Sequence, residues 1–226
     1  MAALLLAAGL TVAPWGIRNW RVIGRPVITT THGGYTLLLG NNPAYYREVV
    51  SQPLGVVWDG SRGAGQQAWA ADLQRQTEAA GLSGEVEVDG WMTSEAWRTI
   101  RGEPGMFARA CLRRVVHFWS IVPNVRSDSG LPPFAVWSVG AYYVVLFTGF
   151  AVGLVCVGAG GVDRRDWLIP VVLIAGFAGV HVLYWSDARM RAPVTPEIGM
   201  LATCGATRFR DRERRFAQMT GDGRGP

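Results

Sequence analysis

Two long stretches without a charged residue place the strongest constraint on how this chain folds. No charged side chain occurs from Ser129 to Val162 or from Trp167 to Ser186, where His181 is the only group that titrates near neutral pH. Each stretch is mostly apolar and long enough to cross a hydrocarbon core of about 30 Å as a helix. We therefore expect a mainly α-helical integral membrane protein rather than one or two soluble domains.

The alternation of polar and apolar sequence divides the chain into four parts. Residues 1–17 are apolar but lack the basic start of a signal peptide, so they are expected to be the end of a membrane helix; a short anchor and a cleaved signal peptide are the alternatives. Residues 18–133 form a polar insert, residues 134–207 a transmembrane bundle, and residues 208–226 a basic cytoplasmic tail.

The number of spans expected is three to four. Phe134–Gly158 and Trp167–Trp185 are two spans by length and composition, and residues 1–17 add a third if they are an anchor. Pro193–Thr207 is shorter and carries Glu197, which is unusual inside a membrane. This last segment is either a final short helix or a re-entrant one.

The polar insert is expected to be mostly helical with a short β-hairpin-like region. Val27–Thr31 and Tyr35–Leu39 are β-branched or apolar runs bounded by glycine and asparagine, which predicts two short strands and turns. Helices are predicted over Gln66–Ala80, Ser94–Ile100 and Met106–Ser120.

The distribution of arginine in short loops predicts the orientation. Arg164 and Arg165 separate the two long spans, and an arginine cluster at residues 208–215 follows the last apolar segment. Placing both on the cytoplasmic side puts the insert outside, because long loops translocate largely regardless of charge.

Composition argues against several classes of function. All 22 basic residues are arginine, and the densest cluster flanks an apolar segment instead of lining a soluble face with aromatic residues, so no nucleic-acid partner is expected. The three cysteines and three histidines are scattered without ligand spacing, so no metal site or disulfide framework is expected. These residues are Cys111, Cys156, Cys204, His32, His117 and His181.

Several short strings occur in series and are similar to those of one enzyme family. They are Pro14-Trp-Gly-Ile-Arg-Asn19, Gly24-Arg-Pro26, His32-Gly-Gly-Tyr35, Gly40-Asn-Asn-Pro43, Ile100-Arg-Gly-Glu-Pro104, Phe118-Trp119 and Arg189-Met-Arg-Ala-Pro-Val-Thr-Pro196. Together they resemble the late part of bacterial membrane glycosyltransferases of the dolichyl-phosphate-mannose–protein mannosyltransferase type. Two positions depart from that pattern: His32 stands where asparagine is usual, and Met190 where an aromatic residue is usual.

The resemblance implies transfer of a sugar from a polyprenyl-phosphate carrier to an acceptor on the outer side of the bacterial cytoplasmic (inner) membrane. In that family an aspartate of the first outer loop is the catalytic base, often with a divalent cation, and no part of this chain matches that loop. No catalytic residue and no cofactor is therefore assigned. The chain is expected to be a C-terminal part of such an enzyme, truncated or paired with an upstream-encoded membrane half, and inactive alone. The alternative is a small membrane-anchored binding or assembly protein without catalysis.

Four residues are candidates for binding lipid phosphate or substrate: Arg189, Arg191, Arg18 and Asn19. Arginine binds phosphate bidentately, and each pair lies next to an apolar segment where the phosphate of a lipid would lie. Pro193 favours an extended chain at the residue before it, which would allow Arg189 and Arg191 to point the same way. The alternative for all four is an anchor at the membrane interface.

Overall fold

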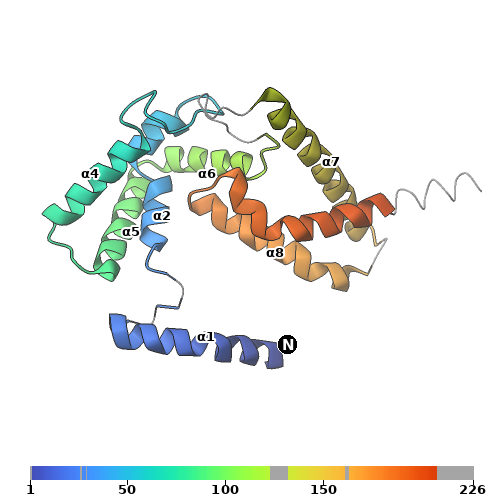
Figure 1. Ribbon diagram of the computed structural model, residues 1–226, viewed down its shortest axis with the longest axis horizontal. Coiled ribbons are helices and arrows are strands. Elements are labelled where there is room, and N and C mark those ends of the chain that lie inside the picture. Colours follow the sequence, from blue (N-terminus) through green and yellow to red (C-terminus); the bar gives the residue numbers. More distant parts are fainter. Residues whose placement is uncertain (1, 26, 29, 123–131, 161–162, 208–226) are drawn as a thin grey trace, which may run out of the picture. The chain divides into compact units, whose positions relative to one another are not determined.

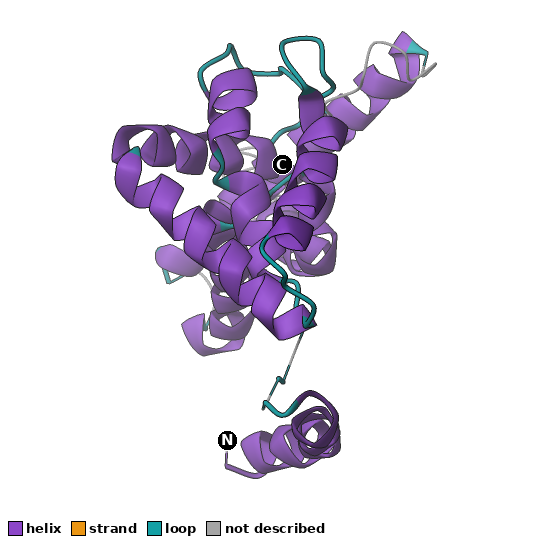
Figure 2. Ribbon diagram, turned by 90° about the vertical axis from the view of Figure 1, so that its left-hand side faces the viewer, coloured by secondary structure: helices purple, strands orange, loops and turns teal. Residues whose placement is uncertain are grey.

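The computed structural model describes residues 2–25, 27–28, 30–122, 132–160 and 163–207. Two compact units, Met1–Ala110 and Cys111–Pro226, make up the chain, and the boundary between them falls inside a helix (Figure 1). The described residues form helices and loops without any strand (Figure 2). The expectation of a mainly α-helical protein is confirmed.

Helix α1, Ala2–Ile23, opens the first unit and runs through Pro14 without ending. The helix also continues past residue 17, so the change to polar sequence there is not a helix end. From within α1, the side-chain nitrogen Nδ2 of Asn19 donates a hydrogen bond to the carbonyl of Val27, beyond the end of the helix, at 2.8 Å. This bond fixes the direction in which the chain leaves α1.

The predicted β-hairpin is wrong, because its second strand is part of helix α2, Gly33–Gly40. The described residues of Val27–Thr31 form an irregular segment. A carboxylate far along the chain explains the helix: Asp89 accepts a hydrogen bond from the Gly34 amide at 2.6 Å, which satisfies one of the free donors at the start of α2. The absence of a side chain at Gly34 also lets α2 lie directly against the backbone of Asp89.

The predicted break at Gly40–Pro43 is present as a junction between helices. Asn41 donates from its side chain to the Leu37 carbonyl at the end of α2, and Asn42 accepts from the Tyr45 amide at the start of α3, both at 2.8 Å. Helix α3, Pro43–Tyr45, continues directly into a π-helical turn, Tyr46–Val50. The two asparagines therefore cap two successive helices.

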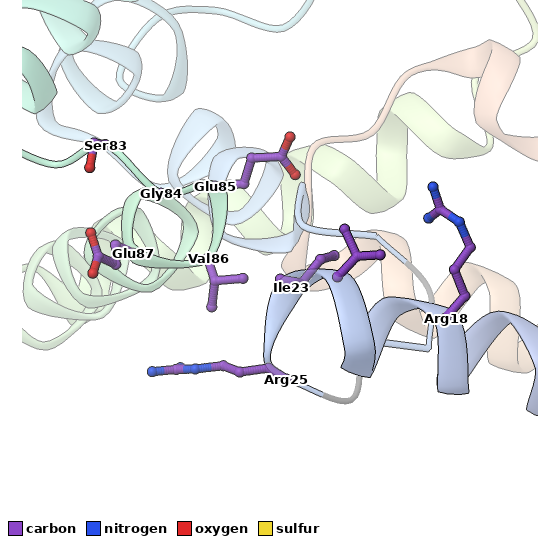
Figure 3. A pocket seen from close by; sticks show the side chains of 9 residues that line it. Arg18, Ile23, Arg25, Ser83, Gly84, Glu85, Val86 and Glu87 are labelled. Carbon is purple, nitrogen blue, oxygen red and sulfur yellow. The ribbon is translucent and has the colours of Figure 1, made fainter.

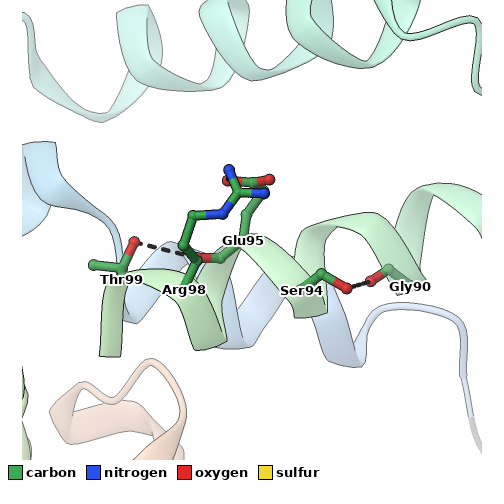
Figure 4. Close-up of polar contacts among 5 residues, drawn as sticks. All are labelled: Gly90, Ser94, Glu95, Arg98 and Thr99. Atoms are coloured by element: carbon green, nitrogen blue, oxygen red, sulfur yellow. Dashed lines mark hydrogen bonds and ion pairs between the residues drawn. The ribbon is translucent and has the colours of Figure 1, made fainter. Parts of the chain in front are cut away.

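Helices α4, Gly65–Ala79, and α5, Glu85–Gly102, complete the fold of the first unit together with the start of α6. The α4 prediction is confirmed, whereas α5 begins nine residues before the predicted start at Ser94 (94 − 85 = 9). One face of α5 packs on α2, and its solvent face carries an ion pair between Glu95 and Arg98 at 2.9 Å (Figure 4).

The second unit contains the end of α6, Pro104–Phe118, and the helices α7, Pro133–Gly158, and α8, Arg164–Leu183. A 3-10 helix, Ala188–Val194, follows and leads into a helical segment at residues 195–207. The apolar core of the unit consists of Phe118, Ile174, Val194, Ile198 and Leu201.

Two helices in the described part of the chain, α7 and most of α8, are long and apolar enough to cross a membrane. Both were predicted as spans, and most of their large apolar side chains are exposed. Neither α1 nor the segment at residues 195–207 meets the same standard of length and apolarity within the described residues, so two of the expected three to four spans are found. The arginine-rich tail at residues 208–226 lies outside the described residues.

Candidate functional site

A cavity of about 500 Å³ in the second unit brings together two of the predicted site residues. Arg189 and Arg191 both line it from the 3-10 helix, which is where the sequence predicted an extended chain. The other wall comes from the first half of α7. The full lining is Val139, Tyr143, Ala188, Arg189, Arg191, Ala192 and Thr195.

Arg191 is buried, with 2 % of its surface exposed, and its guanidinium is held by the end of α6. Its Nη1 donates to the carbonyls of Phe118 and Ser120, each at 2.7 Å. These carbonyls lie at the C-terminus of α6, where backbone acceptors lack partners inside the helix and the helix dipole favours a cation. The guanidinium carbon also lies 4.0 Å from the centre of the Tyr143 ring, which adds a cation–π contact.

Arg114 forms the reciprocal contact from α6 to α8. This residue is 1 % exposed, and its Nη1 donates to the carbonyls of Val182 and Leu183, each at 2.9 Å. A buried arginine therefore caps the C-terminus of each helix: Arg114 of α6 caps α8, and Arg191 of the 3-10 helix after α8 caps α6. This pair of caps fixes the 3-10 helix and with it the cavity wall that carries Arg191.

Arg189 has a different environment, because its side chain is 90 % exposed. Its guanidinium forms an ion pair with Asp187 at 3.1 Å, and Asp187 also accepts from the Arg189 amide at 2.7 Å. The hydrogen bond that Arg189 donates to Asp187 raises the pKa of Arg189, so the guanidinium is charged at any physiological pH. An exposed surface ion pair of this kind contributes little stability and can exchange partners.

The second predicted pair, Arg18 and Asn19, lies on α1 in the first unit. Arg18 donates to the Asn19 side-chain oxygen at 3.3 Å and is exposed, whereas Asn19 is 3 % exposed and bonded to Val27. Arg18 lines a separate cavity of about 630 Å³ between the end of α1 and the start of α5 (Figure 3). The buried side chain of Asn19 therefore stabilises the fold after α1 and is not exposed to a ligand.

Two polar residues near the end of α6 were not predicted as site residues. Burial is the largest cause that lowers the pKa of His117, Arg113 lowers it further, and Asp187 opposes them. Burial likewise raises the pKa of the Cys111 thiol. In the sequence, apolar residues become more frequent toward the end of α6. This pattern indicated that the region is buried, but it did not indicate which residues contact His117 and Cys111.

Within the described residues no group of three or more histidine, cysteine, aspartate or glutamate side chains is placed to hold a metal ion. No carboxylate lines the 500 Å³ cavity, so it combines cationic and apolar groups and offers no general base. Such a site can bind an anion attached to an apolar group.

No protein-family model matches the chain, and comparisons with curated proteins and with solved structures likewise find no match.

Proposed function

We propose that this chain is a membrane-bound part of a sugar-transfer system that uses a polyprenyl-phosphate-linked sugar, and that it binds the phosphate of the lipid carrier. The observation that carries the proposal is the shared cavity: two guanidinium groups line it next to apolar side chains of α7. A lipid phosphate has the same two chemical parts, an anionic head and an apolar chain. The series of family-like sequence strings supplies the expectation of a sugar donor.

The two arginines have different roles in this proposal. Arg189 binds the phosphate directly, because its exposed guanidinium can exchange the Asp187 carboxylate for a phosphate, which accepts two parallel hydrogen bonds from an arginine. Arg191 is a positioning residue, because two backbone carbonyls already occupy its Nη1. Its buried charge still adds a positive potential to the cavity wall.

The chain contributes binding and not the chemical step in this proposal. The catalytic aspartate of the family is not assigned to any residue, and no carboxylate lines the described cavity. The absence of a base from the lining also favours the second candidate, a membrane-anchored binding or assembly protein that retains the lipid site without catalysis. An upstream-encoded membrane half is the proposed partner of the first candidate.

Binding of a short polyprenyl phosphate to the purified chain in nanodiscs tests the proposal. We expect Arg189→Gln to weaken binding about tenfold, the loss of one charge-assisted contact, without changing the melting temperature. Arg191→Gln should weaken binding and also lower the melting temperature. Arg165→Gln is the control, because this exposed arginine lies at the opposite end of α8.

Three outcomes separate the candidates. Equal affinity of the wild type and Arg189→Gln contradicts the phosphate site. A loss of affinity that Arg165→Gln shares equally indicates general attraction to a basic surface and also contradicts it. If the chain binds the lipid phosphate without a partner half, and upstream-encoded sequences do not restore sugar transfer, the result favours the membrane-anchored binding protein over the part of an enzyme.

A further inference from the structure

A second, smaller cavity lies inside the first unit, between the segment before α2 and the first half of α5. Its volume is about 290 Å³, close to the lower end of the range of ligand pockets, about 300–1,000 Å³. The residues that give it chemical character are His32, Tyr35, Glu85, Asp89 and Met92. None of its lining residues is an arginine, although the chain contains 22 arginines.

Two carboxylates face this cavity from one side of α5. Glu85 and Asp89 are four residues apart, a spacing that places like charges next to each other on a helix and destabilises it slightly. Each uses one oxygen inside the protein: Glu85 Oε2 accepts from Thr31 Oγ1 at 3.1 Å, and Asp89 Oδ1 accepts from the Gly34 amide. Within the described residues neither forms an ion pair.

Two arginines, Arg18 and Arg25, line the neighbouring cavity, to which Glu85 also belongs. Neither forms an ion pair with Glu85 within the described residues. In Figure 3 the Glu85 carboxylate and the Arg25 guanidinium extend in different directions, Glu85 from the start of α5 and Arg25 from the segment after α1. The smaller cavity is therefore negative, although the whole chain carries a formal charge of +5.

The remaining walls present an aromatic ring and apolar groups. The Tyr35 ring contacts His32 edge to face and Trp69 in a tilted arrangement, with a centroid distance of 6.1 Å to each. Val88 and Met92 continue the α5 face beside the carboxylates. An aromatic ring beside two carboxylates attracts a cation through its negative face as well as through charge.

We propose that this cavity binds a small organic ligand that carries a protonated primary amine. An ammonium group has three donors and no acceptor, which matches the two unused carboxylate oxygens and the face of Tyr35. A divalent metal ion is the less suitable occupant, because the described residues nowhere gather three metal-binding side chains. This site lies in the first unit and does not depend on the phosphate site of the second.

The test compares two fluorinated probes that differ in one group: 4-fluorobenzylamine carries a charged ammonium, and 4-fluorobenzyl alcohol carries a neutral hydroxyl. Each is titrated by fluorine NMR against the full chain in detergent. We expect saturable binding of the amine and at least about tenfold weaker binding of the alcohol, because only the amine makes charge-assisted hydrogen bonds. Glu85→Gln and Asp89→Asn should each weaken amine binding several-fold.

Glu87→Gln is the matched control, because Glu87 lies on the same turn of α5 but does not line this cavity. Circular dichroism and thermal unfolding report whether Asp89→Asn disturbs the start of α2. If this variant is less folded, the amine affinity of the Glu85→Gln variant alone decides the test, because Glu85 is exposed. Equal affinity for amine and alcohol, or equal losses in Glu85→Gln and Glu87→Gln, overturns the proposal. Arg189→Gln should leave amine binding unchanged, so this test and the phosphate test fail separately.

Discussion

Glu48 is a buried carboxylate whose hydrogen-bond donors are all uncharged. It is 9 % exposed and accepts from the Trp58 indole at 2.9 Å, the Gly65 amide at 3.0 Å and the Ala64 amide at 3.3 Å. The last two donors lie at the start of α4, where backbone amides lack partners inside the helix. One side chain thus connects the loop that holds Trp58 to the helix that follows it.

Replacing Glu48 by glutamine should destabilise the first unit. Glutamine keeps one acceptor but places an amide donor against other donors, and each lost bond to the charged group costs about 1.5–3 kcal/mol. We expect the melting temperature, followed by tryptophan fluorescence in detergent, to fall by about 5 °C or more. Glu78→Gln is the control, because its carboxylate is on the exposed face of α4; an equal fall in both variants would contradict the role of Glu48.

His117 should make stability depend on pH. Burial and Arg113 lower its pKa in the folded state below the usual value of 6.5. The folded chain therefore binds the proton less readily than the unfolded chain, so stability is full above about pH 6.5 and falls as the pH drops toward the folded pKa. His117→Asn should reduce the loss of melting temperature between pH 7.5 and pH 5.5. His32→Asn, at an exposed position in the other unit, should not; an unchanged slope in His117→Asn would refute the assignment.

The site residues show how far single positions can be predicted. The sequence predicted the same role for Arg189 and Arg191 and an extended backbone around them. The structure separates them, because Arg191 caps α6 from more than seventy residues away whereas Arg189 pairs with its neighbour Asp187. Contacts between residues that are adjacent in sequence are predictable from spacing, and caps supplied by a distant helix are not.

At the scale of elements, periodic or uniformly apolar segments were predicted best. Helices α4, α6, α7 and α8 follow from apolar periodicity or long apolar runs. Helix α2 was missed because a short apolar run bounded by glycine and asparagine suits a strand as well as a helix, and the Asp89 cap and the close contact at Gly34, which favour the helix, come from residues far along the chain. The first half of α5 was missed because charged and apolar residues alternate in Glu85-Val-Glu-Val88, and this two-residue period is not that of an amphipathic helix.

Small residues set the contact between α7 and the helical segment at residues 195–207. A side chain at Gly153 would collide with the Leu201 backbone, and one at Gly205 would come within 2.6 Å of the Gly149 carbonyl. Gly149 and Gly153 are one helical turn apart, a spacing that allows helices in membranes to approach closely. The two helices therefore pack backbone to backbone.

Gly153→Ala should destabilise the second unit although alanine favours helix. The added methyl group meets backbone atoms that cannot rotate away, so overpacking should cost about 1–3 kcal/mol. Gly176→Ala in α8 is the matched control: nothing lies near its added methyl group, so the melting temperature should stay constant or rise. The comparison uses thermal unfolding in one detergent, and a Gly153→Ala variant as stable as Gly176→Ala would contradict close packing.

At the scale of the whole molecule, two helices of the length and composition of membrane spans follow a polar unit that is rich in buried aromatic residues. The exposed faces of α7 and α8 carry Phe134, Trp137, Val145, Ile169 and Val172, and an exposed apolar surface of this kind marks a contact with protein or with lipid. A lipid environment removes these side chains from water without further protein contacts. The second unit thus has a small internal core of its own and a large apolar surface around it.

The arginine asymmetry predicts which side of the membrane each polar segment faces. Arg165 lies in the first turn of α8, next to the short connection from α7, so the positive-inside rule predicts that this connection faces the cytoplasm and that the first unit lies outside. Single cysteines at Gln67, Ser83 and Arg165 test this after Cys111, Cys156 and Cys204 are replaced by serine. The first two positions are exposed on the first unit. A position such as Gly63 in the same unit would not serve, because a side chain added there would collide with Glu48.

In intact cells, a membrane-impermeant maleimide should label Gln67→Cys and Ser83→Cys but label Arg165→Cys only after permeabilisation. The protein should also remain in the membrane pellet after carbonate extraction, because two apolar helices hold it there. The cysteine-free chain is the control for background labelling. Labelling of Arg165→Cys in intact cells would reverse the orientation, and release by carbonate would show that α7 and α8 bury their apolar faces against protein instead of lipid.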